Sequence, residues 1–225
     1  MFEKMRERWT KAITPLVHRM EGVDPSTLTW TSLALSLVAF YLLMDAGRNT
    51  EGAVYIIGGV VIVLIAGVLD GLDGALARHQ GTDGPYGDFL DHTIDRIVDV
   101  GILVAIGINA DFVNNPSSGY IAGLLTLFGS YMGTQAQSVG LGRIYGGFSR
   151  ADRMVLTLVA LIVTAWQAHE GASGVSIESY HWLADWALLG NSELNGMTFA
   201  LAISAWGGVY TFIVRFVKTR NGLIA

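Results

Sequence analysis

The amino-acid sequence predicts an all-α membrane protein with six transmembrane helices and an N-terminal amphipathic helix at the membrane interface. Of its 225 residues, 52% are hydrophobic and only 15% are charged, whereas soluble domains average about 25% charged residues. Six segments also approach the length of about 20 mostly apolar residues that a membrane-spanning helix needs. The chain length suits a single membrane domain over residues 1–225.

Stretches rich in Gly, Asn and Pro separate the six segments and set their approximate ends. The predicted spans, which together make a bundle over residues 28–217, are Leu28–Met44, Ala53–Ala77, Gly87–Asn109, Tyr120–Gln137, Asp152–Ala168 and Gly196–Val217. A further apolar stretch at residues 180–189 is too short to span a membrane. It predicts an interfacial helix with Trp182 and Trp186 as its anchors.

The first 22 residues combine Lys and Arg with apolar residues that recur at intervals of three and four. Such intervals place the apolar side chains on one face of a helix, so residues 1–22 predict a basic amphipathic helix. This helix can lie in the membrane interface or pack on the protein itself, and the two arrangements are compatible.

The distribution of Lys and Arg predicts the orientation in the membrane. With a cytoplasmic N-terminus and six crossings, the C-terminus is also cytoplasmic, and thirteen of the fourteen basic residues fall on the cytoplasmic face. Only Arg48 falls on the other face. This bias follows the positive-inside rule, so we expect a multi-pass protein of the cell membrane with both termini in the cytoplasm.

Four aspartates gather where the second and third predicted spans meet the cytoplasm. Asp70 and Asp73 are three residues apart and Asp91 and Asp95 are four apart, so each pair shares a helical face. A short loop joins the two helices, and antiparallel neighbours would bring the pairs together. Four carboxylates in a partly dehydrated site repel one another, and a hard divalent cation relieves that repulsion. The residues therefore predict a metal-dependent phosphate or diphosphate site at the cytoplasmic boundary.

Spacing alone leaves other functions open. Carboxylates in membrane helices can form an ion pathway or pair with basic residues, and Asp95 beside Arg96 could be a structural pair. A cation transporter would be expected to carry its carboxylates near the bilayer midplane, whereas these lie at helix ends. A membrane prenyltransferase also binds diphosphate through aspartates and Mg²⁺, but its aspartate motifs lie far apart. The absence of cysteine excludes disulfides, thiolate metal sites and a Cys nucleophile.

A longer pattern surrounds the four aspartates. From Asp70 the chain reads Asp, two residues, Asp73-Gly74, two residues, Ala77-Arg78, eight residues, Gly87, three residues, Asp91, three residues and Asp95. These eight residues, at this spacing, match the signature of the CDP-alcohol phosphotransferase family. The chain resembles that family over nearly its whole length, and it looks closest to archaeal members that act on phosphorylated polyols.

The resemblance implies a role for each motif residue. Asp70, Asp73 and Asp91 would bind Mg²⁺ or Mn²⁺, with two ions bridging the diphosphate of a CDP-lipid. Asp95 would complete the metal site and act as the base on the incoming hydroxyl. Gly87 would allow the second and third helices to pack closely. The residues implied to contact the CDP-lipid are Thr29, Gly74, Ala77 and Arg78. The family also implies a homodimer through the third and fourth spans, and no nucleic acid partner is expected.

The implied reaction transfers the lipid phosphate of CDP-archaeol or CDP-diacylglycerol to an alcohol and releases CMP. Near the start of the fifth span the chain carries Arg143, Arg150 and Arg153, and the last two could grip one anion together. The Arg-Ala-Asp-Arg run is similar to family branches that accept a phosphorylated polyol such as inositol phosphate or glycerol phosphate. The positive-inside rule alone also predicts arginines here, and an unphosphorylated acceptor such as serine or inositol stays an alternative.

Three residues beside the motif receive secondary interpretations. Asp88 fits a solvated helix cap, and His92 fits a packing residue. Asp99, one turn beyond Asp95, fits either a supporting group for the site or a partner for Arg96.

Overall fold

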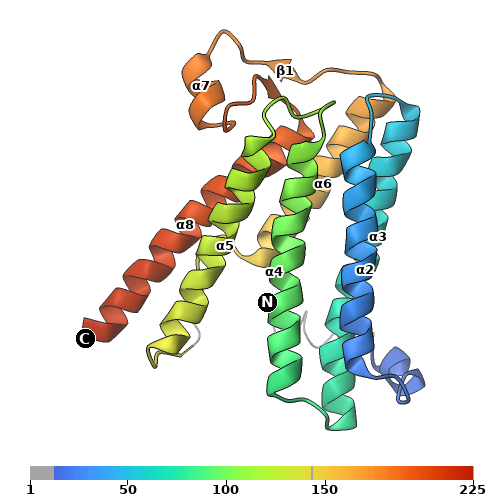
Figure 1. Ribbon diagram of the computed structural model, residues 1–225, viewed down its shortest axis with the longest axis vertical. Coiled ribbons are helices and arrows are strands. Elements are labelled where there is room, and N and C mark those ends of the chain that lie inside the picture. The colour runs from blue at the N-terminus through green and yellow to red at the C-terminus, as the bar shows by residue number, and fades with distance from the viewer. Residues whose placement is uncertain (1–12, 143, 225) are drawn as a thin grey trace. The chain divides into compact units, whose positions relative to one another are not determined.

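The computed structural model describes residues 13–142 and 144–224, and most of them are helical (Figure 1). Residues 13–19 form a helical segment. The elements that follow, in chain order, are α2 (Pro25–Asp45), α3 (Thr50–Gln80), α4 (Pro85–Ile108), α5 (Ser117–Ser138), α6 (Arg150–His169), β1 (Val175–Ser176), α7 (His181–Trp186), β2 (Glu193–Leu194) and α8 (Gly196–Ile224). Each of the six segments predicted to span is a helix, and α7 lies within the predicted interfacial stretch.

Four of these helices have both the length and the apolar composition to cross a membrane, namely α2, α3, α6 and α8. Helices α4 and α5 are 24 and 22 residues long, but they do not join that group. The first turns of α4 carry the aspartates of the motif, and α5 ends in the polar run Thr134-Gln135-Ala136-Gln137. Large apolar side chains also lie on the surface, for example Leu64, Val155 and Ile213, each about half exposed. Apolar surface of this extent marks contact with lipid or with another protein.

Glycines in the left-handed conformation end α3 and α5. Gly81 follows α3 with φ of 67°, and the next N–H, of Thr82, donates to the Ala77 carbonyl at 2.9 Å. Gly140 follows the end of α5 with φ of 85°, and the Leu141 N–H donates to the Ala136 carbonyl at 3.1 Å. Both are Schellman motifs, which need a residue that tolerates positive φ. They fix where each loop leaves its helix.

The described chain divides into two compact units. One comprises residues up to Val38 together with Val61–Val98, and the other comprises Ala39–Val60 together with the chain from Asp99 onward. Helices α2, α3 and α4 each contribute residues to both units.

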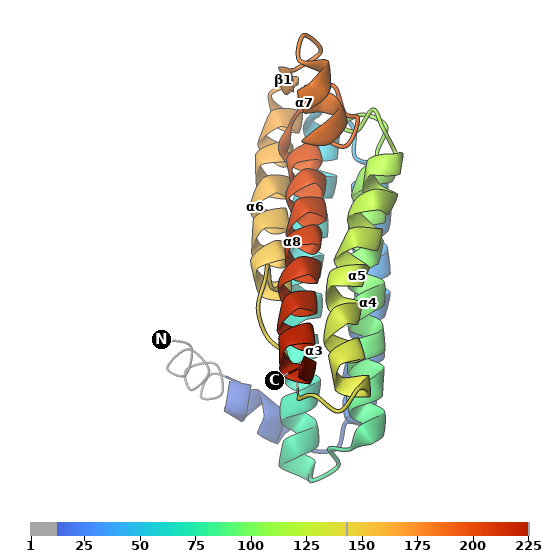
Figure 2. The ribbon, with the colours of Figure 1, turned by 90° about the vertical axis from the view of Figure 1, so that its left-hand side faces the viewer.

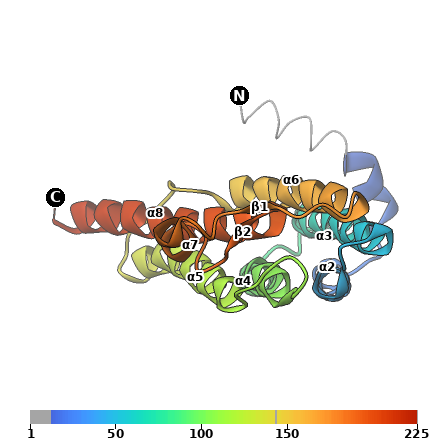
Figure 3. The same ribbon diagram turned by 90° about the horizontal axis from the view of Figure 1, so that it is seen from above.

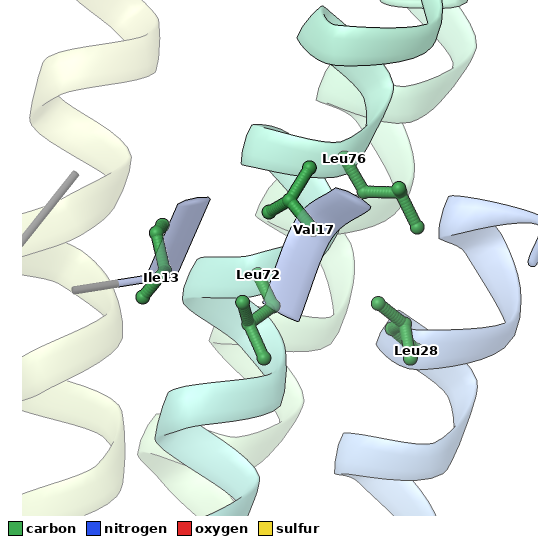
Figure 4. Close-up of a cluster of buried hydrophobic side chains, with 5 residues drawn as sticks. All are labelled: Ile13, Val17, Leu28, Leu72 and Leu76. Atoms are coloured by element: carbon green, nitrogen blue, oxygen red, sulfur yellow. The ribbon is translucent and has the colours of Figure 1, made fainter. Parts of the chain in front are cut away.

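In the first unit, the helical segment at residues 13–19 packs on α3. Ile13 and Val17 are buried against Leu72 and Leu76, and Leu28 of α2 completes the cluster (Figure 4). The four-residue spacing of each helical pair puts both side chains on one face. Of the two arrangements predicted for the amphipathic helix, packing on the protein is thus present at residues 13–19. Residues 1–12 of the predicted helix lie outside the described part of the chain.

In the second unit, α8 packs against both α5 and α6 (Figure 2). A side chain at Gly208 would collide with the backbone of Leu125 and Thr126 in α5. At Gly196, a side chain would collide with the Ala160 carbonyl of α6. Small residues let membrane helices approach this closely, so these two glycines set the helix packing of the unit.

Hydrogen bonds from Arg48, called the Arg48 network below, join three segments at one end of the second unit. The Arg48 guanidinium donates to the carbonyls of Asp111 and Ala172 and to Oε1 of Glu193 at 2.7 Å, and it lies 4.7 Å from the centre of the Phe112 ring. Glu193 belongs to β2, which pairs antiparallel with β1, and the segment that carries α7 and both strands lies beside α8 (Figure 3). Arg48, the one basic residue predicted to lie away from the cytoplasmic face, therefore holds together segments that are up to 145 residues apart in sequence.

The Arg48 network also shifts the pKa of the Glu193 carboxyl. Partial burial acts to raise the pKa of its carboxyl. Hydrogen bonds from Arg48, Asn195 and the Gly174 N–H, together with the Arg48 charge, outweigh that effect and hold the pKa below its usual value. A carboxyl whose pKa is lowered on folding stabilises the fold above its unfolded pKa, and this contribution is lost as the pH falls through the folded value.

We therefore expect Glu193→Gln to lower the free energy of unfolding by about 1–3 kcal/mol at pH 7, since the Arg48 guanidinium loses a charged partner. The deficit should shrink as the pH falls below about 4.5, where the unfolded wild type binds a proton. Unfolding followed in detergent at pH 7 and at pH 4 measures both effects. The control is Glu178→Gln, at an exposed glutamate, and an equal loss in that variant would contradict the assignment.

Candidate functional site

Three of the four predicted aspartates come together in the first unit. Asp70 and Asp73, near the C-terminal end of α3, and Asp91, in the second turn of α4, each offer a carboxylate oxygen, and these oxygens lie within 4.8 Å of one another. The Schellman motif at Gly81 and the start of α4 at Pro85 leave only a short loop between the helices. The short loop therefore brings the aspartates of the motif, which are separate in sequence, into one cluster of carboxylates.

Asp73 is the most firmly held of the three. It is only 6% exposed, and its Oδ2 accepts a hydrogen bond from Thr29 Oγ1 at 2.5 Å while Oδ1 accepts one from the Gly74 N–H. Thr29 itself is buried one turn into α2, where its hydroxyl also reaches the Pro25 carbonyl at 3.4 Å. Thr29 therefore orients a carboxylate of the cluster.

A second group shares Asp91 with the first. Single ligand atoms of Asp91, His92 and Asp95 also lie within 4.8 Å of one another. Asp95 is 8% exposed, and its Oδ2 lies 3.6 Å from the Arg96 guanidinium. His92 was expected to be a packing residue, and that prediction was wrong. Its ring is about half exposed and faces Asp91 at 3.6 Å and Asp88 at 3.9 Å, because residue 92 lies beside the acids of its own helix turn.

The donor set of the first group fits a hard divalent cation. Mg²⁺ and Mn²⁺ favour carboxylate oxygens. Two oxygens bound to one Mg²⁺ lie at most about 4.2 Å apart, so only small side-chain shifts separate the observed spacing from a bound one. Carboxylates held this close repel one another unless a cation lies between them. Asp70, Asp73 and Asp91 are therefore the residues that would hold the metal.

The small residues of the motif line the same stretch of α3. A Cβ built on Gly74 would lie 3.3 Å from Nη1 of Arg78, so the Arg78 side chain folds back over Gly74. Ala77 lies three residues after Gly74, on the same face of the helix. Gly87 was expected to permit close helix packing, and that prediction was wrong: it is exposed, and a Cβ there would meet nothing within 4 Å.

In the second unit, Arg150 and Arg153 converge on one anion, as their three-residue spacing predicted, but that anion is Asp99. Nε of Arg150 lies 3.1 Å from Oδ1 of Asp99, and Nη2 of Arg153 lies 2.7 Å from Oδ2. Asp99 is 2% exposed and Arg153 is 7% exposed. Arg143, the third predicted arginine, lies outside the described residues.

Sequence reasoning did not find this partner of Asp99. It offered Arg96, which instead lies near Asp95. A signal was present, since a carboxylate inside an apolar helix is costly without a cation, and a pair of arginines in the first turn of α6 could supply one. The distance in sequence, more than 50 residues, hid the pairing.

An N-terminal cap explains why the two arginines face the same way. Ser149 is the N-cap of α6, and its side chain and that of Asp152 form a capping box. The box starts the helix at Arg150, so Arg150 and Arg153 follow on one helical face.

A family model and a similar protein of known name both point to one family. The family model described as CDP-alcohol phosphatidyltransferase matches residues 23–189. The archaetidylinositol phosphate synthase of Methanothermobacter thermautotrophicus is 36% identical over 159 residues, which cover 70% of this chain and 75% of that protein.

Two crystal structures of the Mycobacterium tuberculosis phosphatidylinositol phosphate synthase share the fold. One has CDP-DAG bound and the other is a complex with manganese and citrate; each has a TM-score of 0.66 at 20% identity. They cover 93% and 92% of this chain, and the matched part is 94% and 88% of theirs. At that identity the likeness concerns the fold, whereas the matched model spans most of this chain and includes all eight motif residues. The chain therefore belongs to the CDP-alcohol phosphatidyltransferase family.

Proposed function

We propose that this protein transfers the lipid phosphate of a CDP-lipid to the hydroxyl of a phosphorylated polyol, with inositol phosphate as the favoured acceptor, and releases CMP. The observation that carries the proposal is the gathering of Asp70, Asp73 and Asp91 within 4.8 Å inside the full eight-residue motif. The acceptor is inferred from the relatives, which are synthases of archaetidylinositol phosphate and phosphatidylinositol phosphate. The lipid donor is CDP-archaeol or CDP-diacylglycerol.

The metal-binding residues in this proposal are Asp70, Asp73 and Asp91, with Asp95 completing the set. Two Mg²⁺ or Mn²⁺ ions bound there would neutralise the diphosphate and stabilise the CMP leaving group. Thr29 keeps the Asp73 carboxylate aimed by its short hydrogen bond. Oriented ligands of this kind need little rearrangement when substrate binds.

The nucleotide is proposed to bind along the motif stretch of α3. Gly74 and Ala77 present almost no side chain, so a cytidine ring could approach the helix closely. Arg78, folded back over Gly74, supplies a guanidinium that can pair with the nucleotide phosphate. Thr29 would contribute at the donor site through Asp73.

Asp95 is proposed to accept the proton of the acceptor hydroxyl. As that proton leaves, the hydroxyl oxygen forms a bond to the lipid-bearing phosphorus, and the bond from this phosphorus to the CMP oxygen breaks. The Arg96 guanidinium lies 3.6 Å from Asp95 and places a positive charge beside the proposed base.

Arg143, Arg150 and Arg153 are proposed to bind the phosphate of the acceptor. The Asp99 carboxylate holds Arg150 and Arg153 at 3.1 and 2.7 Å, so both guanidiniums are already placed before any ligand arrives. Two guanidiniums held side by side on one carboxylate give an acceptor phosphate a pair of charged donors.

With four helices able to cross a membrane and a place in this family, the chain is a multi-pass membrane protein. We propose that α4 and α5 also cross, giving one domain of six spans, with the amphipathic segment at residues 1–22 on the cytoplasmic interface. The support is the asymmetry of Lys and Arg. Both termini and the active site would then be cytoplasmic.

We also propose a homodimer through α4 and α5, on the resemblance to the family. Native mass spectrometry in several mild detergents tests it, and a monomer in each of them would argue against the dimer.

The reaction class is tested by exchange of radiolabelled CMP into CDP-lipid, which neither a prenyltransferase nor a transporter performs. We expect exchange and net synthesis to vanish in excess EDTA and to return with Mg²⁺ or Mn²⁺. Asp73→Asn should lower kcat about 10³-fold or more, since charge stabilisation by the bound metal contributes several kcal/mol. Asp88→Asn, at an exposed acid of α4, is the matched control. Full activity in excess chelator would exclude the proposed chemistry.

Asp95→Asn separates proton transfer from donor binding. We expect kcat to fall by about 10²–10⁴-fold, the usual contribution of a general base, while CDP-lipid still binds with affinity close to wild type. Steady-state kinetics together with a CDP-lipid binding assay measure the two effects. Near-normal turnover in this variant would show that Asp95 is not the base.

Arg150→Ala is the cleaner test of the acceptor site, because the Arg150 side chain is one-third exposed whereas Arg153 is buried and also supports Asp99. A lost charged hydrogen bond costs about 1.5–3 kcal/mol, so the acceptor KM should rise roughly tenfold or more while the CDP-lipid KM stays unchanged. Arg220→Ala, at an exposed arginine of α8, removes the same charge as a control. Unchanged acceptor KM in Arg150→Ala, or a preference for serine or inositol, would leave these arginines as structural partners of Asp99 and not as an acceptor site.

A further inference from the structure

A further group of metal-ligating side chains, which shares no residue with the two groups that contain aspartates, lies on the surface of the first unit. Nδ1 of His18 lies 3.2 Å and Nε2 of His79 lies 3.0 Å from the same oxygen, Oε1 of Glu21. The three ligand atoms all lie within 4.8 Å of one another, and all three residues are exposed. The motif and the proposed transferase reaction use none of them.

We propose that His18, Glu21 and His79 form a binding site for a transition metal of the Zn²⁺ class, which clips the N-terminal segment to the end of α3. Two imidazoles and one carboxylate make up a donor set that Zn²⁺ favours, with a fourth position left for water. Mg²⁺ favours oxygen ligands only, so this site would differ in metal preference from the aspartate cluster.

The spacing of the ligand atoms agrees with that donor set. Zn²⁺ binds imidazole nitrogen and carboxylate oxygen at 2.0–2.2 Å in a tetrahedral arrangement, which puts neighbouring ligand atoms about 3.3–3.5 Å apart. The two nitrogen–oxygen separations of 3.2 and 3.0 Å need only small outward shifts, and the two imidazole nitrogens lie within 4.8 Å of each other. The two imidazole rings stand nearly perpendicular, at 86° with centroids 4.6 Å apart, so they are close neighbours without stacking face to face.

The chain around the three ligands is already held in place. Nε2 of Gln80 donates to the carbonyls of Glu21 and Val23 at 3.0 and 2.9 Å, which fixes the backbone beside Glu21. Val17 and Ile13, four and eight residues before Glu21, are buried against α3 (Figure 4). A site assembled by the fold loses little entropy when an ion binds.

The carboxylate of Glu21 is placed to bind a cation together with the two imidazoles. Its Oε1 already faces both imidazoles, and a carboxylate brings a negative charge that favours a bound cation. Without a metal, the same geometry is a pair of hydrogen bonds between the two imidazoles and one carboxylate oxygen. The two arrangements are separated by adding the metal itself.

The full-length protein in detergent, stripped by chelator and then supplied with excess Mg²⁺ for the aspartates, is titrated with Zn²⁺ by calorimetry. We expect one Zn²⁺ per chain. His79→Gln and Glu21→Gln should each weaken binding roughly 100-fold or more, since loss even of a residue that only supports a metal ligand costs 10–100-fold. His181→Gln, at an exposed histidine of α7, should bind as the wild type does.

His79→Cys distinguishes a lost ligand from a damaged fold, because a thiolate is also a Zn²⁺ ligand. We expect it to keep Zn²⁺ binding, and with Co²⁺ in place of Zn²⁺ its visible spectrum should gain a sulfur-to-metal band. Two results would overturn the proposal: wild-type binding no tighter than that of His79→Gln, or a loss of Zn²⁺ binding in His79→Cys equal to that in His79→Gln. Neither result depends on transferase activity, so the clip and the proposed reaction can fail separately.

Discussion

The mutual repulsion of acidic side chains at the meeting of α3 and α4 is the constraint on which the rest of the first unit depends. Asp70, Asp73 and Asp91 bring their oxygens within 4.8 Å, and Asp73 is almost fully buried. Acids in this position cost free energy in a protein without a cation. The local structure nevertheless enforces the arrangement, through the left-handed Gly81, the short loop to Pro85 and the hydrogen bond from Thr29 to Asp73. The apparent cost is a reason to expect function at this place.

Much of the fold could be predicted from the sequence, because apolar length and glycine-rich breaks both have direct structural meaning. The six predicted spans are all helices, and five of them end within about three residues of their predicted bounds. The sixth, α8, continues to Ile224, since Arg215, Lys218 and Arg220 are good helix formers and only the hydropathy ended at Val217. Helix α4 is not among the helices that are apolar enough to cross a membrane, because it carries the charged residues of the motif.

Contacts between distant segments were the part that sequence could not supply. Helical spacing predicted that Asp70 and Asp73 share a face, and that Arg150 and Arg153 do. It had no means to pair Arg150 with Asp99 across 51 residues, or His79 with Glu21 across 58. The contacts of the Arg48 network are a further case of pairing between distant segments. The sequence marked Arg48 as an exception to the charge bias, and the structure reveals what the arginine binds. It satisfies backbone carbonyls of two loops and the carboxylate of a third.

Under the proposed function, in which Arg150 and Arg153 bind the acceptor phosphate, their pairing with Asp99 affects which acceptor is favoured. A buried carboxylate that fixes two guanidiniums removes most of the entropy that these long side chains would lose on gripping a ligand. Its negative charge also offsets part of their positive charge, which lowers their attraction for any weak anion. A phosphate monoester carries close to two negative charges at neutral pH and offers three acceptor oxygens, so it gains from both guanidiniums despite Asp99. A neutral alcohol or a zwitterion such as serine gains little. Under the proposed function, the Asp99 arrangement therefore favours a phosphorylated acceptor by charge as well as by geometry.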